Sequence, residues 1–437
     1  MLRLSLDRLR RMRRSWLRTP RAHDSGGDAR LRALAPRLEA ALRDNIVDFW
    51  HPRCLDRAHG GYVTGFGPRG EPTGETPRRL VIQARMLWLF ARLATEEPYD
   101  RRAMLAAAEH GYRFLCERML DHRHGGYYWE VDARGDGVTS AEKHLYGQAF
   151  ALYALSQYAI ASGRGDVLEH AGRLMDLLET TAHDAVHAGY QESFREDWSP
   201  VPGGERGCLG PGGLKRMNTH LHLLEAMTVY HRASGRALAR ERILELITVL
   251  ANAVVRKGVV ACTDQHDRDW RPRPEPHARR VSYGHDLENV WLLIDACEAA
   301  GVSHSPLHDL FRGLSANALR HGFDARNGGF YLDGPLGRRA DRRQKVWWVQ
   351  AEALIALLRM SRITRDPQFL SAFERTWQFL ERHQIDWEHG EWHATVAPDG
   401  SVHGDKGDRW KAGYHTGRSM LECLALLRTL EAGPRSA

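Results

Sequence analysis

Two pairs of the form His-x-x-Glu are prominent among the residues that could do chemistry: His222 with Glu225, and His285 with Glu288. In a helix this spacing places both side chains on one face, one turn apart. The carboxylate can then hold its histidine in one tautomer and orient the ring. Because an imidazole titrates near neutral pH, such pairs suit a reaction in which a proton leaves a carbon and another returns to it.

A third histidine, His415, lies in the last of six similar polar clusters, beside Tyr414 and near Lys411. Any one of these histidines alone is more often a structural residue near a helix end. Together they fall at equivalent places in three repeats of the chain, with Arg, Tyr, Trp and Gln as neighbours. We therefore interpret His222, His285 and His415 as catalytic residues that share one cavity.

Other residues of the six clusters are suited to binding a small polar substrate. Arg85 is the best candidate to stabilise the oxyanion of an enediolate, and Trp347, Trp348 and Trp410 offer flat apolar faces on which a sugar ring can stack. The clusters cover residues 79–85, 143–148, 218–225, 282–288, 347–352 and 410–418, and their remaining candidates for substrate binding are Tyr146, Asn218, Glu225, Glu288, Glu352 and Arg418.

The sequence lacks motifs for several other chemistries. A metal site with two His and Glu ligands is one alternative, but the compact His-Glu-x-x-His spacing that makes such sites specific does not occur. The chain also has no Walker A phosphate loop and no Gly-x-Ser-x-Gly nucleophile. We therefore expect neither a metal nor an organic cofactor.

The elements that position the clusters are predicted by a unit that recurs about six times along the chain. Each unit has a turn rich in Gly and aromatic residues, a polar cluster, and a helix whose apolar residues recur at i, i+3, i+4 and i+7. Intervening segments with the same period supply a partner helix. The turns are residues 59–62, 124–127, 187–190, 327–330 and 389–392, with no clear copy in the fourth unit, and the helices begin near Gln83, Gln148, Asn218, His285, Gln350 and Thr416.

Six such helix pairs predict an all-α fold, an (α/α)6 barrel of six helical hairpins in a single domain. An open solenoid is the alternative, and it is disfavoured because the polar residues cluster at the same end of every inner helix. We expect residues 31–432 to form the barrel and catalytic domain. Residues 1–30 are predicted to be a basic, flexible N-terminal arm.

The net charge of +7 arises in the first 21 residues, which contain eight Arg and one Asp. The rest of the chain is close to neutral and has no basic stripe for phosphates, so we expect no nucleic-acid partner. The six Cys are scattered, and no apolar run reaches the roughly 18 residues of a membrane span. These features predict a cytoplasmic protein without a stable membrane span, monomeric or weakly dimeric.

Four motifs resemble those of the N-acylglucosamine 2-epimerase superfamily, and within it the cellobiose 2-epimerase branch. They are Asn-Thr-His-Leu-His-Leu-Leu-Glu-Ala at 218–226, Ser-Tyr-Gly-His-Asp-Leu-Glu at 282–288, Trp-Trp-x-Gln-Ala-Glu at 347–352 and Trp-Lys-x-x-Tyr-His-x-x-Arg at 410–418. The resemblance covers residues 35 to 430 and implies epimerisation at C2 of a reducing-end sugar of the cellobiose type. It also implies ring opening, a cis-enediolate and no organic cofactor.

The resemblance implies roles for individual residues. His285 and His415 match the general acid/base pair, and His222 matches a third histidine that assists ring opening or binding. The matches for substrate contacts are Arg85 as the binding arginine, Glu288 as the carboxylate beside the catalytic histidine, Trp348 and Trp410 as the sugar-stacking aromatics, and Tyr146 as a pocket tyrosine.

Three alternatives to a disaccharide epimerase remain open. The enzyme could act on free mannose or glucose, or convert mannose to fructose, since epimerisation and isomerisation share the enediolate. An inverting glycoside hydrolase on the same barrel would use two of Glu225, Glu288 and Glu352. A carbohydrate-binding scaffold would need no proton donors. We expect the loops at 195–215 and 271–280 to decide which sugar is bound.

Overall fold

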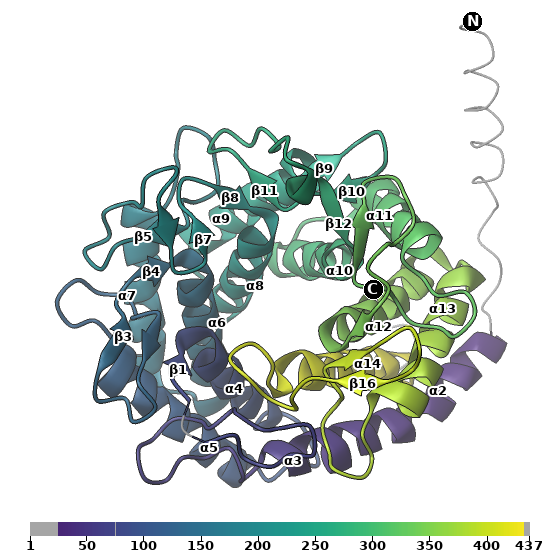
Figure 1. Cartoon of the computed structure of the whole chain (residues 1–437), viewed down its shortest axis with the longest axis horizontal. Helices are drawn as coiled ribbons and strands as arrows, with labels where there is room; N and C mark the ends of the chain where they lie inside the picture. The colour runs from purple at the N-terminus through teal and green to yellow at the C-terminus, as the bar shows by residue number, and fades with distance from the viewer. Residues whose placement is uncertain (1–24, 75, 432–437) are drawn as a thin grey trace, which may run out of the picture.

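The computed structural model describes residues 25–74 and 76–431, and these residues are mostly helical, as predicted. Six inner helices surround the centre of the molecule (Figure 1). Each packs against the next along the chain, and α14 packs against α4, so that the ring is closed. The inner helices are α4 (Leu80–Leu93), α6 (Leu145–Ser162), α8 (Met217–Ser234), α10 (Tyr283–Ala300), α12 (Trp347–Thr364) and α14 (Gly413–Glu431).

An outer helix packs against each inner helix. In five units the outer helix follows its partner in the chain, but α14 pairs with α2, the first described helix. Helix α2 (Ser25–Ala40) continues into the π-helical turn Ala41–Val47 and the short α3 (Asp48–Trp50). The other outer helices are α5 (Arg101–Phe114), α7 (Gly165–Thr181), α9 (Ala237–Thr248), α11 (His308–His321) and α13 (Pro367–Phe379), with π-helical turns at Leu115–Met119, Val249–Ala253 and Leu380–Gln384 and 3-10 turns at Pro276–Arg279 and Ser305–Leu307.

The inner and outer helices differ in how much of their surface is buried. Helix α6 is buried at nearly every position because neighbours cover it on all sides. Helix α5 instead buries one stripe with the helical period, which faces α4, and leaves its other face to solvent. That stripe consists of Met104, Ala107, Ala108, Gly111 and Phe114.

Short antiparallel strands lie at the end of the ring where the inner helices begin. Five of the six inner helices follow directly after such a strand, which fixes where the helix starts. The strands are β1 (Arg78–Arg79), β2 (Glu130–Val131), β3 (Val138–Ser140), β4 (Lys143–His144), β5 (Ser193–Phe194), β6 (Arg206–Gly207), β7 (Gly210–Pro211), β8 (Lys215–Arg216), β9 (Val255–Arg256), β10 (Ala261–Cys262), β11 (Gln265–His266), β12 (Arg280–Ser282), β13 (Asp333–Pro335), β14 (Lys345–Val346), β15 (Thr395–Val396) and β16 (Val402–His403).

The repeated Gly-aromatic turn is held to the next inner helix by a glutamine, an arrangement we call the glutamine clamp. Gln148 of α6 accepts a hydrogen bond from the Tyr127 backbone N–H at 3.0 Å and donates to the Tyr127 carbonyl at 2.7 Å. Gln83 with Tyr62 and Gln350 with Phe330 repeat the pattern. The clamp satisfies buried backbone groups that no strand pairs.

In the five units with this turn, an aspartate three residues before it forms an ion pair with a Lys or Arg. Asp121 accepts hydrogen bonds from two backbone N–H groups of its own turn, and the Lys143 ammonium lies 2.7 Å from its other oxygen. Burial alone would raise the pKa of Asp121, but the Lys143 hydrogen bond and the N–H donors outweigh it and lower the pKa to about 2. The pair joins the turn to β4, directly before α6.

The fourth unit, for which the sequence shows no clear turn, uses a different anchor. Asp286 of α10 accepts a hydrogen bond from the Cys262 backbone N–H at 2.8 Å, in the place where three units have glutamine and the third unit has His220. The second carboxyl oxygen of Asp286 is buried and has no hydrogen-bond partner among the described residues. Burial raises the pKa of Asp286 to about 7.

The predicted division into arm and barrel stays a prediction. Residues 25–30 of the predicted arm form the start of α2, and the rest of the arm lies outside the described residues. Within the part of the chain that is described, no helix has the length and apolar character needed to cross a membrane.

Candidate active site

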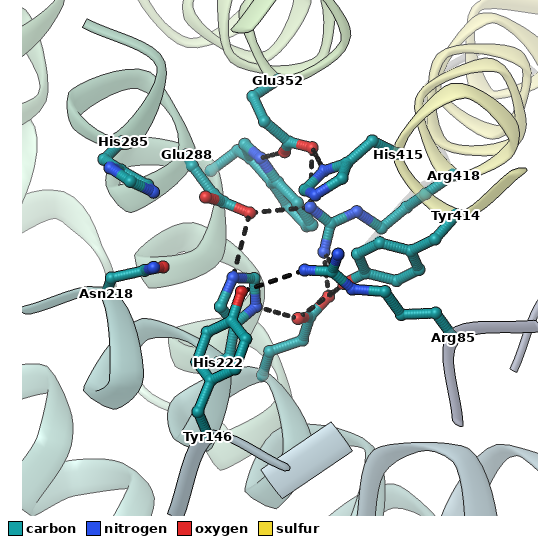
Figure 2. A network of polar contacts seen from close by, with 12 residues as sticks. Arg85, Tyr146, Asn218, His222, His285, Glu288, Glu352, Tyr414, His415 and Arg418 are labelled. Carbon is teal, nitrogen blue, oxygen red and sulfur yellow. Dashed lines mark hydrogen bonds and ion pairs between the residues drawn. The ribbon is translucent and has the colours of Figure 1, made fainter. Parts of the chain in front are cut away.

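The predicted polar clusters fall at the first turns of the inner helices, where the short strands lie. Figure 2 shows side chains from all six inner helices pointing toward one another there. The contributing residues are Arg85 on α4, Tyr146 on α6, Asn218, His222 and Glu225 on α8, His285 and Glu288 on α10, Trp347, Trp348 and Glu352 on α12, and Tyr414, His415 and Arg418 on α14.

The first His-x-x-Glu pair forms a hydrogen bond, as its spacing predicts. His222 Nδ1 lies 2.9 Å from Glu225 Oε2, and both side chains are buried. The Tyr414 hydroxyl also donates to Glu225 at 2.9 Å. With Nδ1 engaged, Nε2 is the nitrogen of His222 that remains available for proton transfer.

The second His-x-x-Glu pair does not form the expected hydrogen bond, which corrects the sequence interpretation. Glu288 turns instead toward Arg418, whose guanidinium lies 2.8 Å from Glu288 Oε1. No hydrogen bond or ion pair joins His285 to Glu288 among the described residues. The positive charge of Arg418 explains the difference, because a buried carboxyl oxygen gains more from a charged guanidinium donor than from a neutral imidazole.

His415 is oriented by a glutamate from the neighbouring helix. His415 Nδ1 lies 2.6 Å from Glu352 Oε1, and the Trp291 indole donates to Glu352 Oε2 at 2.9 Å. Sequence analysis missed Trp291, although it lies one helical turn after Glu288 and its spacing could have suggested a shared face.

Arg418 lies at the centre of the cluster rather than at a surface open to substrate. Its guanidinium contacts Glu225, lies 2.8 Å from Glu288 and 2.7 Å from Glu352, and its side chain is 1% exposed. It also lies over the Tyr414 ring, 4.4 Å from the ring centre. The position indicates that Arg418 supports the three glutamates and through them His222 and His415.

Arg85 is held with its guanidinium among aromatic rings. It donates to the Tyr146 hydroxyl and to the Trp410 carbonyl, each at 3.0 Å, and lies 4.4 Å from the centre of the Phe150 ring. Its Nε is buried and has no hydrogen-bond partner within the described ranges. Arg85 therefore brings a preorganised positive charge to the site.

Two of the three predicted stacking tryptophans lie close to other site residues. The Trp348 ring centre is 4.6 Å from that of His285 and 6.1 Å from that of His415, so the indole lies near both histidines. Trp410 packs near Trp129 at 6.3 Å and is covered by the Arg79 guanidinium. Trp347 instead lies beside the buried Lys411 ammonium.

Asn218 borders the same space as the catalytic candidates. Its backbone N–H donates to Asp264 at 3.0 Å, and its side-chain oxygen is buried without a hydrogen-bond partner in the described structure. Figure 2 shows the amide beside His285, on the side of the site opposite Arg85. A substrate hydroxyl would satisfy this orphaned acceptor.

Comparison with known proteins identifies the family. The model of the N-acylglucosamine 2-epimerase family matches residues 60–418, which is most of the chain. The chain belongs to the N-acylglucosamine 2-epimerase family. It is 29% identical to the cellobiose 2-epimerase of Bacteroides fragilis over 398 residues, covering 90% of this chain and 98% of the relative.

Solved structures of relatives agree with this family. The cellobiose 2-epimerase of Spirochaeta thermophila has a TM-score of 0.81 at 34% identity and covers 92% of this chain and 98% of its own. That of Bacillus thermoamylovorans has a TM-score of 0.83 at 28% identity, over 90% and 99% of the two chains. The predicted family and the predicted enzyme class, a carbohydrate epimerase, are confirmed.

The histidines of this epimerase are neutral at physiological pH. Burial lowers the pKa of His222 to about 4 against the opposing effect of Glu225, and it lowers the pKa of His285. Burial, followed by Arg85 and Arg418, holds the pKa of His415 well below its usual range. A neutral imidazole can accept a proton, so each ring is prepared to act as a base.

One group of ligand-type atoms in the epimerase site is compact enough for a metal ion. Atoms of Glu288, Glu352 and His415 lie within 4.8 Å of one another. Arg418 already contacts both glutamates, so a cation there would have to displace or repel the guanidinium. The donor set fits an ion-pair network better than a metal centre.

Proposed function

We propose that this protein interconverts the gluco and manno configurations at C2 of the reducing-end sugar of a cellobiose-type disaccharide. The observation that carries the proposal is the pair of neutral imidazoles, His285 and His415, near one indole face, that of Trp348. A sugar stacked on Trp348 would have a base within reach on either side.

The proposed reaction needs no oxidant and no external electron carrier. After ring opening, one histidine removes the C2 proton, and the electron pair of the C–H bond forms the C1=C2 bond of a cis-enediolate while negative charge moves to O1. The other histidine returns a proton to the opposite face of C2. The first imidazole gains the proton that C2 loses, the second imidazole is protonated at this step and loses its proton to C2, and exchange with solvent restores both rings, while the electrons remain in the substrate.

The surrounding residues have distinct roles in this proposal. Arg85 stabilises the developing negative charge on the enediolate oxygen. Glu352 fixes the tautomer of His415 and stabilises its protonated form. His222, held by Glu225, exchanges the proton that opens the sugar ring. Tyr146 and Asn218 bind hydroxyl groups, and Trp410 provides a further stacking face.

The closed ring and a cavity between two loops belong to this proposal. We infer that the closed ring of helix pairs is the (α/α)6 barrel predicted from the repeat, with the site inside it. The loops at 195–215 and 271–280, together with Gln265 and Asp267, line a cavity of about 410 Å³ that contains Arg273, Glu275 and His277 and none of the site residues named above. Polar side chains of this kind suit the hydroxyl groups of a second ring.

The hydrolase alternative is weakened by the arrangement of the carboxylates. An inverting glycosidase places two carboxyl groups roughly 6.5–9.5 Å apart around the scissile bond, with room for a water molecule. Here Glu225, Glu288 and Glu352 all contact the single guanidinium of Arg418. They therefore converge on a protein group rather than on a substrate bond.

The proposal is tested by incubating the protein with cellobiose in D2O and following C2 by NMR. We expect deuterium at C2 together with the manno epimer, and loss of both in His415→Ala. His187→Ala, at an exposed histidine of a turn, is the matched control and should retain full activity. Release of glucose would favour the hydrolase, a ketose product the isomerase, and exchange in His415→Ala at the wild-type rate would refute the mechanism.

A further inference from the structure

The buried cluster around Arg418 contains more negative than positive groups. Three glutamates, Glu225, Glu288 and Glu352, contact one guanidinium, and all three have side chains at most 4% exposed. Arg85 on α4 is a second cation that acts on His222 and His415, while two further acidic groups lie outside the three glutamates: Asp264, which acts on His285, and Glu422, one helical turn after Arg418. Two positive charges therefore face three carboxyl groups, and full ionisation would leave a buried net charge of −1.

The other titratable groups at the site do not supply the missing positive charge. His222 on α8, His285 on α10 and His415 on α14 are neutral because burial lowers their pKa. The hydroxyls of Tyr146 on α6 and Tyr414 on α14 are also neutral, since burial raises their pKa. An unbalanced charge in such a poorly solvated place is costly, so the cluster is expected to retain one proton.

The hydrogen-bond partners indicate which glutamate holds that proton. Glu225 is contacted by His222, Tyr414 and Arg418, and Glu352 receives bonds from three donors as well. Among the described residues, Glu288 accepts a hydrogen bond only from Arg418, through Oε1, which also lies 4.0 Å from His222 Nε2, and its buried Oε2 has no partner. Figure 2 shows this second oxygen on the side away from Arg418, toward His285.

A carboxyl group with few donors is the one that protonates most readily. Burial raises the pKa of Glu288 to about 8, and the neighbouring Glu352 adds to the shift against the opposing effect of Arg418. Glu225, which has more donors, has a pKa of about 2, although burial opposes that. The geometry and the charge balance thus agree on Glu288.

We propose that Glu288 is a positioning residue that holds one proton in the active enzyme, which keeps the buried cluster neutral while an anionic enediolate forms beside it. The proposal rests on the proposed epimerase function. Ionisation of Glu288 would add a negative charge to the site and oppose formation of the enediolate. The activity of the enzyme should therefore decline at alkaline pH because of this residue.

The decisive variant is Glu288→Gln, which keeps the size of the side chain and fixes it in the neutral state. Wild-type kcat/KM should fall about tenfold per pH unit above about pH 8. E288Q should retain at least about one tenth of the wild-type value at neutral pH and lose this alkaline decline. Glu352→Gln is the comparison variant in the same cluster: it removes the neighbouring charge that raises the pKa of Glu288, so it should be impaired at every pH and its alkaline decline should begin at a lower pH than in the wild type.

Unfolding measurements test, independently of catalysis, whether Glu288 is protonated in the folded protein. The pKa of Glu288 is raised from 4.5 to about 8, so its contribution to stability is fully present below pH 4.5 and is lost as pH rises through about 8. As pH rises from 5 to about 9, the unfolding midpoint of the wild type should therefore fall relative to that of E288Q. If the wild type is inactive as an epimerase, the proposed function is refuted. The comparison of unfolding midpoints still tests whether Glu288 is protonated.

Several outcomes would overturn the proposal. One is an alkaline decline that persists in E288Q, particularly if Asp286→Asn abolishes it, because the pKa of Asp286 is also raised, to about 7. Another is an E288Q variant impaired as severely as E352Q at all pH values, with no pH-dependent gain in stability. If E288Q does not fold, Glu288→Asp keeps an ionisable group, and an alkaline decline unshifted from the wild type would equally contradict the proposal.

Discussion

At the residue scale, the two histidines proposed to be catalytic and bonded to glutamates use glutamates that lie on different elements. His222 uses a glutamate of its own helix, whereas His415 on α14 uses Glu352 on α12. Both bonds engage Nδ1, which leaves Nε2 of each ring for proton transfer, and Nε2 of His222 lies 4.0 Å from Glu288 Oε1. The two glutamates are linked in turn by Arg418, so one guanidinium holds the partners of two catalytic candidates.

The bond between Glu352 and His415 yields a prediction for Glu352→Gln. An amide cannot stabilise the imidazolium that forms when His415 accepts a proton, so kcat should fall by at least about 100-fold with KM little changed. Steady-state kinetics with cellobiose measure the effect. Glu298→Gln is the control, because Glu298 lies on α10 with its side chain 46% exposed, paired to Arg359. An unchanged kcat in Glu352→Gln would show that the bond has no catalytic role.

At the element scale, the glutamine clamp explains why the Gly-aromatic turn and the polar cluster occur together in the sequence. The turn leaves a buried backbone N–H and C=O without strand partners, and the clamp satisfies both from the first turn of the inner helix. The turn thereby fixes the start of the helix on which the site residues lie. The turn and its glutamine clamp recur around the ring and position the first turn of the inner helix in each unit that has them.

Gln148→Ala should destabilise the protein because it leaves both Tyr127 backbone groups unsatisfied. Each buried unsatisfied group costs about 1–3 kcal/mol, so the free energy of unfolding should fall by a few kcal/mol in total. Urea denaturation measures it. Gln378→Ala on the exposed face of α13 is the control and should change stability by no more than about 0.5 kcal/mol. Equal effects of the two substitutions would contradict the structural role of the clamp.

At the scale of the whole molecule, the chain closes the ring by pairing its first described helix with its last. Helix α14, which bears Tyr414, His415 and Arg418, packs against α2 outside and α4 and α12 beside it. Helix α14 is therefore packed against residues almost four hundred positions earlier in the chain. Surface ion pairs from α2 to the α13 region, such as Arg30 with Glu374, add little by comparison.

Leu38→Ala tests this closure. Leu38 of α2 is fully buried, and its truncation should lower the free energy of unfolding by about 2–5 kcal/mol. The kcat measured well below the unfolding transition should be retained, because Glu352 and Arg418 still hold α14 at the site. Val186→Ala, at a side chain 78% exposed, is the control and should leave stability unchanged. A Leu38→Ala variant as stable as the wild type would show that α2 is dispensable.

The sequence alone determined the repeat, the mainly helical class and the residues that meet at the site. Helical periodicity places His222 and Glu225 on one face, and such local geometry can be predicted from spacing. Only the tertiary structure decided which glutamate serves which histidine. Glu288 pairs with Arg418, and Glu352 on α12 pairs with His415 on α14. The lowest-energy pairing of buried polar groups depends on distances between elements that are far apart in the chain.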